Sequence, residues 1–375
     1  MERPPLDAWF ERTFGDDQPG AFGSGWISGT ASVFLGAVAL LGVLVFAFPD
    51  WLSTERFRGL YPVPLLRSLL QVAIGLAFLL GAISLLLRRR KVLGATGLAL
   101  ALGAALLGGV RAPQAVSDRP VELGLDWFLL NILLLALLFV PIERLFPRRP
   151  EQGVFRIGWT TDGVHFLVSH VMVQALTFLI LFPATTLARF WQPEALRVAL
   201  RGQPLLLQFL EVLLIADLTQ YAVHRAFHRV PALWRFHAVH HSSRDLDWIA
   251  GSRLHLVDIL ATRSLVFLPL FLLGFKESAL NAYLGFVSFH AVFIHANLRF
   301  RFTALEPFLV MPRFHHWHHA SADEARDRNF AVHLPWLDRL FGTAYVPDDR
   351  WPDAYGIAGD PVPEGYLRQM AYPFR

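Results

Sequence analysis

The chain has 375 residues, of which 54% are hydrophobic and only 17% are charged, and its mean hydropathy is +0.42. A soluble chain carries about a quarter charged residues, so this composition indicates an integral membrane protein, and a net charge of +4 does not favour a nucleic-acid binder. The sequence has no cysteine. This excludes disulfides, iron–sulfur clusters, cysteine-ligated zinc and cysteine nucleophiles, and leaves histidine and carboxylate as the strong metal ligands.

Apolar runs long enough to cross a bilayer, about 20 residues each, recur along the chain and predict an all-α, multi-span helical bundle. The acidic residues 1–26 do not resemble a signal peptide, and we expect them to remain as a polar or amphipathic lead-in. A shorter apolar hairpin follows the candidate spans, and because it contains Asp258 and Arg263 it is either a re-entrant pair or two full spans. The six candidate spans are residues 29–48, 68–87, 92–110, 127–146, 164–187 and 204–223, and the hairpin comprises 256–273 and 278–296.

Basic residues are concentrated after the second and fourth candidate spans, at residues 88–91 and 144–149. Cytoplasmic loops carry the excess of arginine and lysine, and counting spans from these loops places both termini and every histidine cluster on the cytoplasmic side. The dominance of arginine and the absence of cysteine favour a bacterial inner membrane.

The distribution of ionisable residues, histidines and prolines divides the sequence into three regions. Residues 1–150 carry four spans with almost no ionisable side chains, so we assign them no role. Residues 151–345 contain all 15 histidines, and we expect them to form the catalytic region. Residues 346–375 contain several prolines, which predict an irregular cytoplasmic tail.

Three histidine clusters share one spacing pattern. Histidines at i, i+4 or at i, i+3, i+4 lie on one face of a helix, and imidazole is a ligand for iron, zinc, copper and nickel. Surface histidines at the membrane edge are the plainer interpretation, but three matching clusters make it weak. Eight imidazoles exceed what one ion takes, so two metal ions are expected. The clusters are His224 and His228; His237, His240 and His241; and His315, His318 and His319.

The region from about residue 210 to residue 345 resembles the fatty acid hydroxylase/sterol desaturase superfamily of membrane di-iron oxygenases, which includes bacterial-type sterol desaturase family proteins. Two departures occur: residues 253–258 read Arg-Leu-His-Leu-Val-Asp where the family often has Arg-x-His-Pro-x-Glu, and Ala331 stands where glycine is usual. The resemblance rests on Asp217, Tyr221, His224, Arg225, His228, residues 233–242, Arg253, His255, His295, Asn297, residues 312–319, Asn329, Phe330 and residues 334–343.

The resemblance extends the expected ligand set beyond the three clusters. It adds His295 at the end of the hairpin and His255 at its start, and it leaves His290 open. The full expected metal ligands are His224, His228, His237, His240, His241, His255, His295, His315, His318 and His319.

Several other residues are candidates for orienting the ligands. Asp217 precedes His224 by two helical turns, so it either accepts a hydrogen bond from a ligand imidazole or pairs with Arg225. We expect His165 and His170 to form helix–helix hydrogen bonds, and His333 to be at the surface. The candidates for supporting the ligands are Asp217, Asp258, Asn297 and His316.

The resemblance implies an O2-dependent oxidoreductase with two iron ions that hydroxylates or desaturates a C–H bond of a membrane lipid, such as a fatty acyl chain or a sterol. The sequence lacks a Gly-rich dinucleotide fingerprint, so a separate ferredoxin, cytochrome or flavoprotein reductase must supply electrons. A metal transporter or sensor remains an alternative, although it would place ionisable residues along the spans. A zinc-dependent hydrolase would use His-Glu-x-x-His, whereas this chain reads His224-Arg-Ala-Phe-His228.

Overall fold

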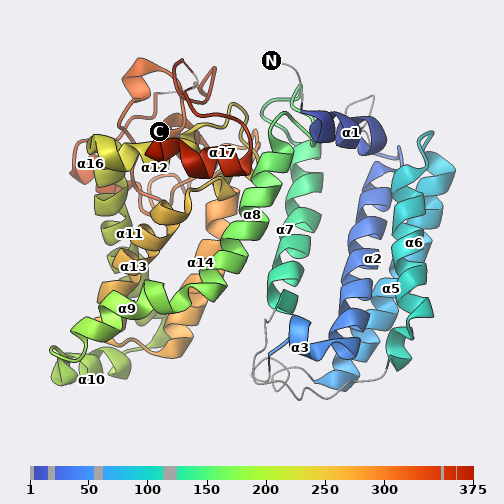
Figure 1. Cartoon of the computed structure of the whole chain (residues 1–375), viewed down its shortest axis with the longest axis horizontal. Helices are drawn as coiled ribbons and strands as arrows, with labels where there is room; N and C mark the ends of the chain where they lie inside the picture. The colour runs from blue at the N-terminus through green and yellow to red at the C-terminus, as the bar shows by residue number, and fades with distance from the viewer. Residues whose placement is uncertain (1–3, 16–21, 55–61, 113–124, 348–349, 360) are drawn as a thin grey trace. The chain divides into compact units, whose positions relative to one another are not determined.

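The computed structural model describes residues 4–15, 22–54, 62–112, 125–347, 350–359 and 361–375. Within these ranges the regular structure is helical, with one isolated bridge between Ala320 and Tyr355 (Figure 1). The chain divides into two compact units: residues 9–154 form one, and residues 1–8 together with 155–375 form the other. We call them the N-terminal unit and the histidine unit. The prediction of an all-α membrane protein is confirmed.

Six helical runs in the described ranges are long and apolar enough to cross a membrane by length and composition. A seventh candidate is a helix pair, α8 (Trp159–Ala175) and α9 (Thr177–Leu187), bent by 43° at their junction. α14 (Glu277–Phe293) has 17 residues and is shorter than each of the six runs. The six are α2 (Trp26–Ala47), α5 (Val63–Leu87), α6 (Val92–Leu106) with η1 (Gly109–Arg111), α7 (Leu125–Leu145), α11 (Leu205–Arg229) and α13 (Leu256–Leu273).

The N-terminal unit is a bundle in which α2, α5 and α6 pack on one another, with α7 and the short α3 (Pro49–Leu52) beside α2. Small residues line these contacts, as is usual between helices in lipid. A Cβ on Gly36 would lie 2.9 Å from the Gly97 carbonyl oxygen, so the two backbones approach closely. The Ser32 hydroxyl donates to the Ala77 carbonyl oxygen at 2.7 Å and joins α2 to α5.

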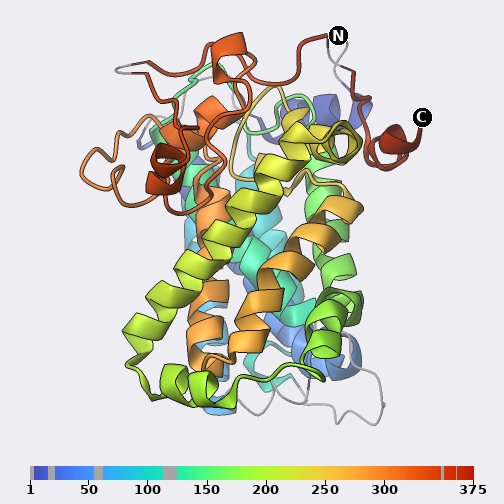
Figure 2. The same ribbon diagram turned by 90° about the vertical axis from the view of Figure 1, so that its left-hand side faces the viewer.

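In the histidine unit α13 and α14 pack on α11, and α9 and α10 (Glu194–Gly202) pack on α13 (Figure 2). α11 ends at Arg229, and α12 (Pro231–His241) begins with a proline at its first position, where its missing N–H costs nothing. α12, α16 (Trp336–Leu340) and α17 (Tyr366–Ala371) lie at one end of these helices, and α10 lies at the other (Figure 1). The remaining short elements are α15 (Pro312–His318), η2 (Ala250–Ser252), η3 (Asp323–Ala325) and η4 (Tyr372–Phe374).

Residues 346–375 are more ordered than the proline content predicts. Their described part contains α17 and η4, and Gln369 in α17 is fully buried. The Gln369 side-chain oxygen lies 2.7 Å from Nε2 of His165 in α8. Hydrogen bonds to distant segments, which leave no local periodicity, therefore fix a tail that looks irregular in sequence.

The acidic lead-in contributes directly to the histidine unit. α1 (Pro5–Phe14) carries Asp7, whose carboxylate is fully buried and accepts hydrogen bonds from the backbone N–H groups of Gly158 (2.8 Å) and Thr160 (3.0 Å). These groups open α8, where N–H donors lack helical partners. Asp7 therefore caps a helix more than 150 positions away in sequence.

Candidate metal centre

Nine histidines form two groups at the end of the histidine unit where α12 lies. Within each group the ligand nitrogens all lie within 4.8 Å of one another. Group A comprises His224 and His228 of α11, His237 and His241 of α12, and His318 of α15. Group B comprises His240 of α12, His295 after α14, His315 of α15 and His319. All are buried except the half-buried His228.

Two group A histidines point nitrogen lone pairs at each other. His224 donates from Nδ1 to the Phe330 carbonyl oxygen (2.8 Å), and His237 donates from Nδ1 to the Asp258 carboxylate (2.7 Å). Acceptors on Nδ1 assign the proton to that atom in each ring and leave Nε2 as a lone pair. The two Nε2 atoms are 3.0 Å apart, a repulsive contact that a shared cation would make favourable. This arrangement fits a metal ion.

Further imidazole nitrogens in both groups are buried without a hydrogen-bond partner. They are Nε2 of His228, His241 and His318 in group A, and Nδ1 of His315 and His319 in group B. Buried polar atoms in folded proteins are nearly always bonded, so the unpartnered Nε2 atoms of group A also fit metal ligation. In group B, Nε2 of His315 lies 3.0 Å from Nε2 of His295 and 3.1 Å from Nε2 of His319, so these nitrogens converge as well. The donor set, imidazole alone, suits iron, zinc, copper or nickel.

Outer hydrogen bonds orient the remaining rings. In group B, His240 donates from Nδ1 to the Arg253 carbonyl oxygen (3.1 Å), and His295 donates to that of Ala291 (2.7 Å). In group A, His318 donates to the Arg328 carbonyl oxygen (2.8 Å). Metal-ligating histidines characteristically donate their other ring N–H to a carbonyl or carboxylate, and both groups follow this pattern.

Burial favours the neutral form of six of these imidazoles. It lowers the pKa of His295 to about 4. Burial, reinforced by neighbouring imidazoles, lowers the pKa values of His240, His241, His315, His318 and His319 well below the usual value. A metal ligand must be the neutral imidazole, so at neutral pH the rings already have the protonation state that binding requires.

Two buried carboxylates hold the segment that supports His224. Asp338 accepts from the backbone N–H groups of Phe330 (2.8 Å) and Ala331 (2.7 Å). Asp217 accepts from those of Val332, His333 and Leu334 at 2.6–3.0 Å. The two carboxylates therefore fix the position of the Phe330 carbonyl oxygen. Asp217 acts through this backbone, and the structure shows neither of the direct contacts considered for it, with a ligand imidazole or with Arg225.

The structure places His255 outside both groups. Its Nε2 lies 3.0 Å from the Met370 carbonyl oxygen, and its Nδ1 accepts from the Val257 N–H at 3.1 Å. Both ring nitrogens therefore have protein partners, and we leave His255 out of the ligand set. Its position in the sequence motif gave no sign of these contacts, because one of them is with the tail.

His290 and His333 form a separate buried pair. Their Nδ1 atoms are 3.1 Å apart, and Nε2 of His290 donates to the Val310 carbonyl oxygen at 2.9 Å. His333 is 1% exposed, so the expectation that it lies at the surface is wrong. Asp217 fixes the backbone around His333 and thereby turns the ring inward.

The other predicted supporting residues lie close to group B or to group A. His316 contacts the Tyr355 hydroxyl (2.7 Å) through Nδ1 and the His295 carbonyl oxygen (3.2 Å) through Nε2. Asn297 is buried two residues after His295. Asp258 is the acceptor for His237, as described above. His165 bonds to the tail, and the side chain of His170 lies outside the described residues.

Sequence reasoning missed several supporting groups. Asp327, at φ 56°, places its carboxylate 3.4 Å from Nδ1 of His228. Tyr355 supports His316, and its segment covers α15: the Gly356 N–H donates to the His319 carbonyl oxygen at 3.3 Å. The carbonyl oxygens at Arg253, Arg328 and Phe330 are invisible in sequence because every residue has one. Of these supporting groups, only Asp327 could have been noticed in the sequence, because it is an acidic residue beside the Asn329-Phe330 motif.

Comparisons with known proteins match the region that holds these groups. Residues 209–343 match the family model described as fatty acid hydroxylase. The chain is 35% identical over 172 residues to ornithine lipid hydroxylase OlsE of Rhizobium tropici, covering 46% of this chain and 51% of that protein. It is 30% identical over 134 residues to alkylglycerol monooxygenase of Homo sapiens (36% and 30%) and 31% identical over 145 residues to fatty acid hydroxylase vlmA of a Lecanicillium species (35% and 40%). The matches thus span about half or less of each relative, and no solved structure matches.

Proposed function

We propose that the chain is a membrane-bound, O2-dependent lipid hydroxylase, because residues 209–343 match the fatty acid hydroxylase family model and contain the histidine motifs that resemble that family. The proposed cofactor is a pair of iron ions, one held by each histidine group. When bound, the irons would supply the oxygen activation and redox chemistry that no side chain provides.

One observation carries the proposal: nine buried histidines form two adjacent groups whose free nitrogens converge. Rings of both groups lie close together, with centroids of His241 and His319 4.4 Å apart and those of His318 and His319 5.2 Å apart. Two ions held side by side suit a reaction that needs two electrons. A transport pathway would instead distribute ligands along the spans.

The protein's own residues would hold the ligands in place and keep the site dry. Phe330, Asp258, Arg253, Ala291 and Arg328 accept the outer N–H groups of five ligands, which fixes the tautomers and turns the free nitrogens inward. The ligand rings are almost wholly buried, so water is excluded from the positions where a reactive species would otherwise be quenched.

The substrate we propose is the hydrocarbon part of a membrane lipid. α11 exposes Leu206, Leu210, Leu214 and Leu218 at four-residue spacing, an apolar stripe on the helix that carries His224 and His228. A lipid lying along such a stripe would direct its chain toward group A. The relatives are described as acting on ornithine lipids, alkylglycerols or fatty acids, which supports a lipid substrate for this chain. Desaturation of such a chain is the alternative outcome.

The proposal also includes an electron donor and an orientation. A separate ferredoxin, cytochrome or flavoprotein reductase would deliver electrons, since hydroxylation by O2 consumes two. Basic loops after two of the spans support a cytoplasmic position for the histidine end in a bacterial inner membrane. Such a position would make the centre accessible to a soluble donor.

The test combines metal analysis with turnover. Full-length protein purified in detergent after expression with iron should contain about two irons per chain, and membranes should form hydroxylated lipid only with O2 and a reductant. His240→Ala and His318→Ala each remove a ligand and should abolish product formation while the thermal unfolding midpoint stays measurable. Unchanged turnover in both variants, or a single zinc in place of iron, would contradict the proposal.

A further inference from the structure

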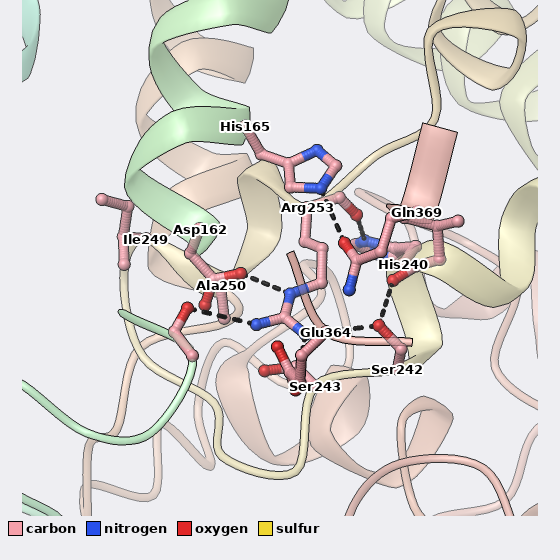
Figure 3. Close-up of polar contacts among 12 residues, drawn as sticks. Asp162, His165, His240, Ser242, Ser243, Ile249, Ala250, Arg253, Glu364 and Gln369 are labelled. Atoms are coloured by element: carbon pink, nitrogen blue, oxygen red, sulfur yellow. Dashed lines mark hydrogen bonds and ion pairs between the residues drawn. The ribbon is translucent and has the colours of Figure 1, made fainter. Parts of the chain in front are cut away.

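Four buried charges form a network beside group B, and Figure 3 shows two of them, Asp162 and Arg253. Arg156 binds Asp247 through Nε (2.7 Å) and Asp162 through a terminal nitrogen (2.6 Å), and Arg253 forms an ion pair with the other oxygen of Asp162. All four residues are at most 4% exposed. Glu364, whose carboxylate is partly exposed, lies 3.8 Å from Arg253, and the two buried arginines and two buried aspartates form a charge-balanced network. We call it the buried quartet.

The quartet is connected to His240 through the backbone of Arg253. The Arg253 carbonyl oxygen accepts from Nδ1 of His240, and the Arg253 guanidinium also donates to the Ser242 hydroxyl and the Gly158 carbonyl oxygen, each at 3.3 Å. Anchoring the side chain of Arg253 in this way fixes its backbone, and with it the hydrogen bond that orients His240 (Figure 3).

The quartet is connected to His295 through the turn that precedes Arg253. Asp247 accepts from the backbone N–H groups of Ile249 (3.2 Å) and Ala250 (3.0 Å), which open the helical turn η2. Gly251 in this turn lies against the imidazole of His295, where an added Cβ would be 2.6 Å from Nδ1. The turn therefore forms a wall of fixed position behind a second group B ring.

The group A histidines have other supports. His224, His237 and His318 donate to Phe330, Asp258 and Arg328, and His228 lies beside Asp327. Among the described residues these four supports make no direct hydrogen bond or ion pair with the quartet, which approaches group A only through the Arg253–Ser242 hydrogen bond beside His241. The outer acceptors of the group A rings are therefore distinct from the quartet.

We propose that Arg156, Asp162, Asp247 and Arg253 are positioning residues for one half of the metal centre: they set the affinity of group B for its metal and leave group A unaffected. The inference rests on the proposed function, because it requires both groups to bind metal. Substitution of residues that support metal ligands commonly weakens metal affinity by about 10- to 100-fold, and this is the loss we expect for group B.

The experiment uses full-length, metal-free protein in detergent titrated with Co²⁺, whose visible absorption reports on each site. One background, His228→Ala/His318→Ala, retains group B, and the other, His315→Ala/His319→Ala, retains group A. Asp162→Asn should weaken Co²⁺ binding by about 10- to 100-fold in the first background and by less than about twofold in the second. Arg253→Gln should behave in the same way, and Arg253→Lys should recover part of the affinity.

Two further variants control for folding and for charge. Asp162→Asn/Arg253→Gln removes one charge of each sign, so it eliminates the contacts without leaving a lone buried charge. It should still show the selective loss. Asp323→Asn breaks the exposed ion pair with Arg326 and should change neither group. Equal losses in both backgrounds, or no loss for group B, would overturn the inference. Fewer than two Co²⁺ per wild-type chain would instead refute the proposed centre, and the inference with it.

Discussion

At the scale of single residues, an outer partner decides which nitrogen carries the proton in five of the nine imidazoles. A carbonyl or carboxylate oxygen accepts from Nδ1 of His224, His237, His240, His295 and His318, and the opposite nitrogen is free for a metal. The sequence identified the ligand-rich clusters because their spacing is periodic. It could not identify the carbonyl oxygens that select the tautomers, since these depend on how distant segments pack.

Asp258 provides the clearest residue-scale prediction. Its carboxylate is the only charged acceptor among those five partners, and Thr262 donates to its other oxygen at 3.1 Å. Asp258→Ala removes the acceptor of His237 and should weaken metal binding to group A by about 10- to 100-fold. Co²⁺ titration of the variant would measure this change, with the group B site as an internal reference. Loss of affinity at group B alone would contradict the assignment.

His255 is a metal ligand in the set that the motif resemblance implies, but it is not part of the set that the structure supports. Because both of its ring nitrogens are bonded to protein, His255→Ala should retain about two metal ions per chain and lose only stability. Metal analysis of purified His255→Ala would decide between the two ligand sets. His240→Ala, which does remove a ligand, is the matched control. A drop to one metal ion would restore His255 to the ligand set.

His333 should make the folded state sensitive to acid. Burial lowers its pKa to about 3, against 6.5 for the exposed side chain. The unfolded chain therefore binds a proton that the folded chain does not, and stability is full above pH 6.5 and falls as the pH decreases toward 3. Between about pH 8 and about pH 5 the wild type should lose about 2 kcal/mol more than His333→Gln. Unfolding midpoints at the two pH values would test this, and parallel curves would contradict it.

At the scale of elements, hydropathy located most of the helices, but two features of the structure could not be predicted from it. The span predicted at 164–187 is broken after α8, since Leu176, between the two helices, has a non-helical backbone. The tail contains α17, which hydropathy could not reveal because the helix is short and its buried residue is the polar Gln369. A polar side chain that is buried by pairing looks in sequence like one that is exposed.

The cap on α8 gives a prediction at this scale. Asp7→Ala leaves the N–H groups of Gly158 and Thr160 without their acceptor, and loss of such a cap costs about 1 kcal/mol. The thermal unfolding midpoint of the variant in detergent should fall accordingly. Glu324→Gln, at an exposed acid in η3, is the matched control and should leave the midpoint unchanged. Equal midpoints for the two variants would show that Asp7 contributes no cap.

At the scale of the whole molecule, the absence of cysteine makes membrane orientation directly testable. α10 and α17 lie at opposite ends of the histidine unit, and each has an exposed charged residue, Glu194 and Arg368. In intact bacterial cells a membrane-impermeant thiol reagent should label Glu194→Cys, whereas Arg368→Cys should react only after permeabilisation. The reverse pattern would place the histidine end outside the cytoplasm.

Composition could not predict that the histidine unit is formed by two separate stretches of the chain. We divided the chain near residue 150 because all 15 histidines follow that position, and in the structure residues 9–154 form one compact unit. No local sequence pattern indicates that residues 4–8 belong with 155–375, where the Asp7 carboxylate accepts from two backbone N–H groups. Long-range contacts of this kind have no counterpart in local sequence patterns.

The docking of Tyr355 and Gln369 has a consequence for biosynthesis. A ribosome adds about 5–20 residues per second, and Gln369 follows the last ligand, His319, by 50 positions, so the nascent chain carries all nine ligands for about 3–10 s before Gln369 is translated. Tyr355, which bonds to His316, is translated 36 positions after His319, and Gln369, which bonds to His165, follows later. A metal ion delivered before then would meet a centre that lacks these supports, unlike a metal ion offered to the finished protein.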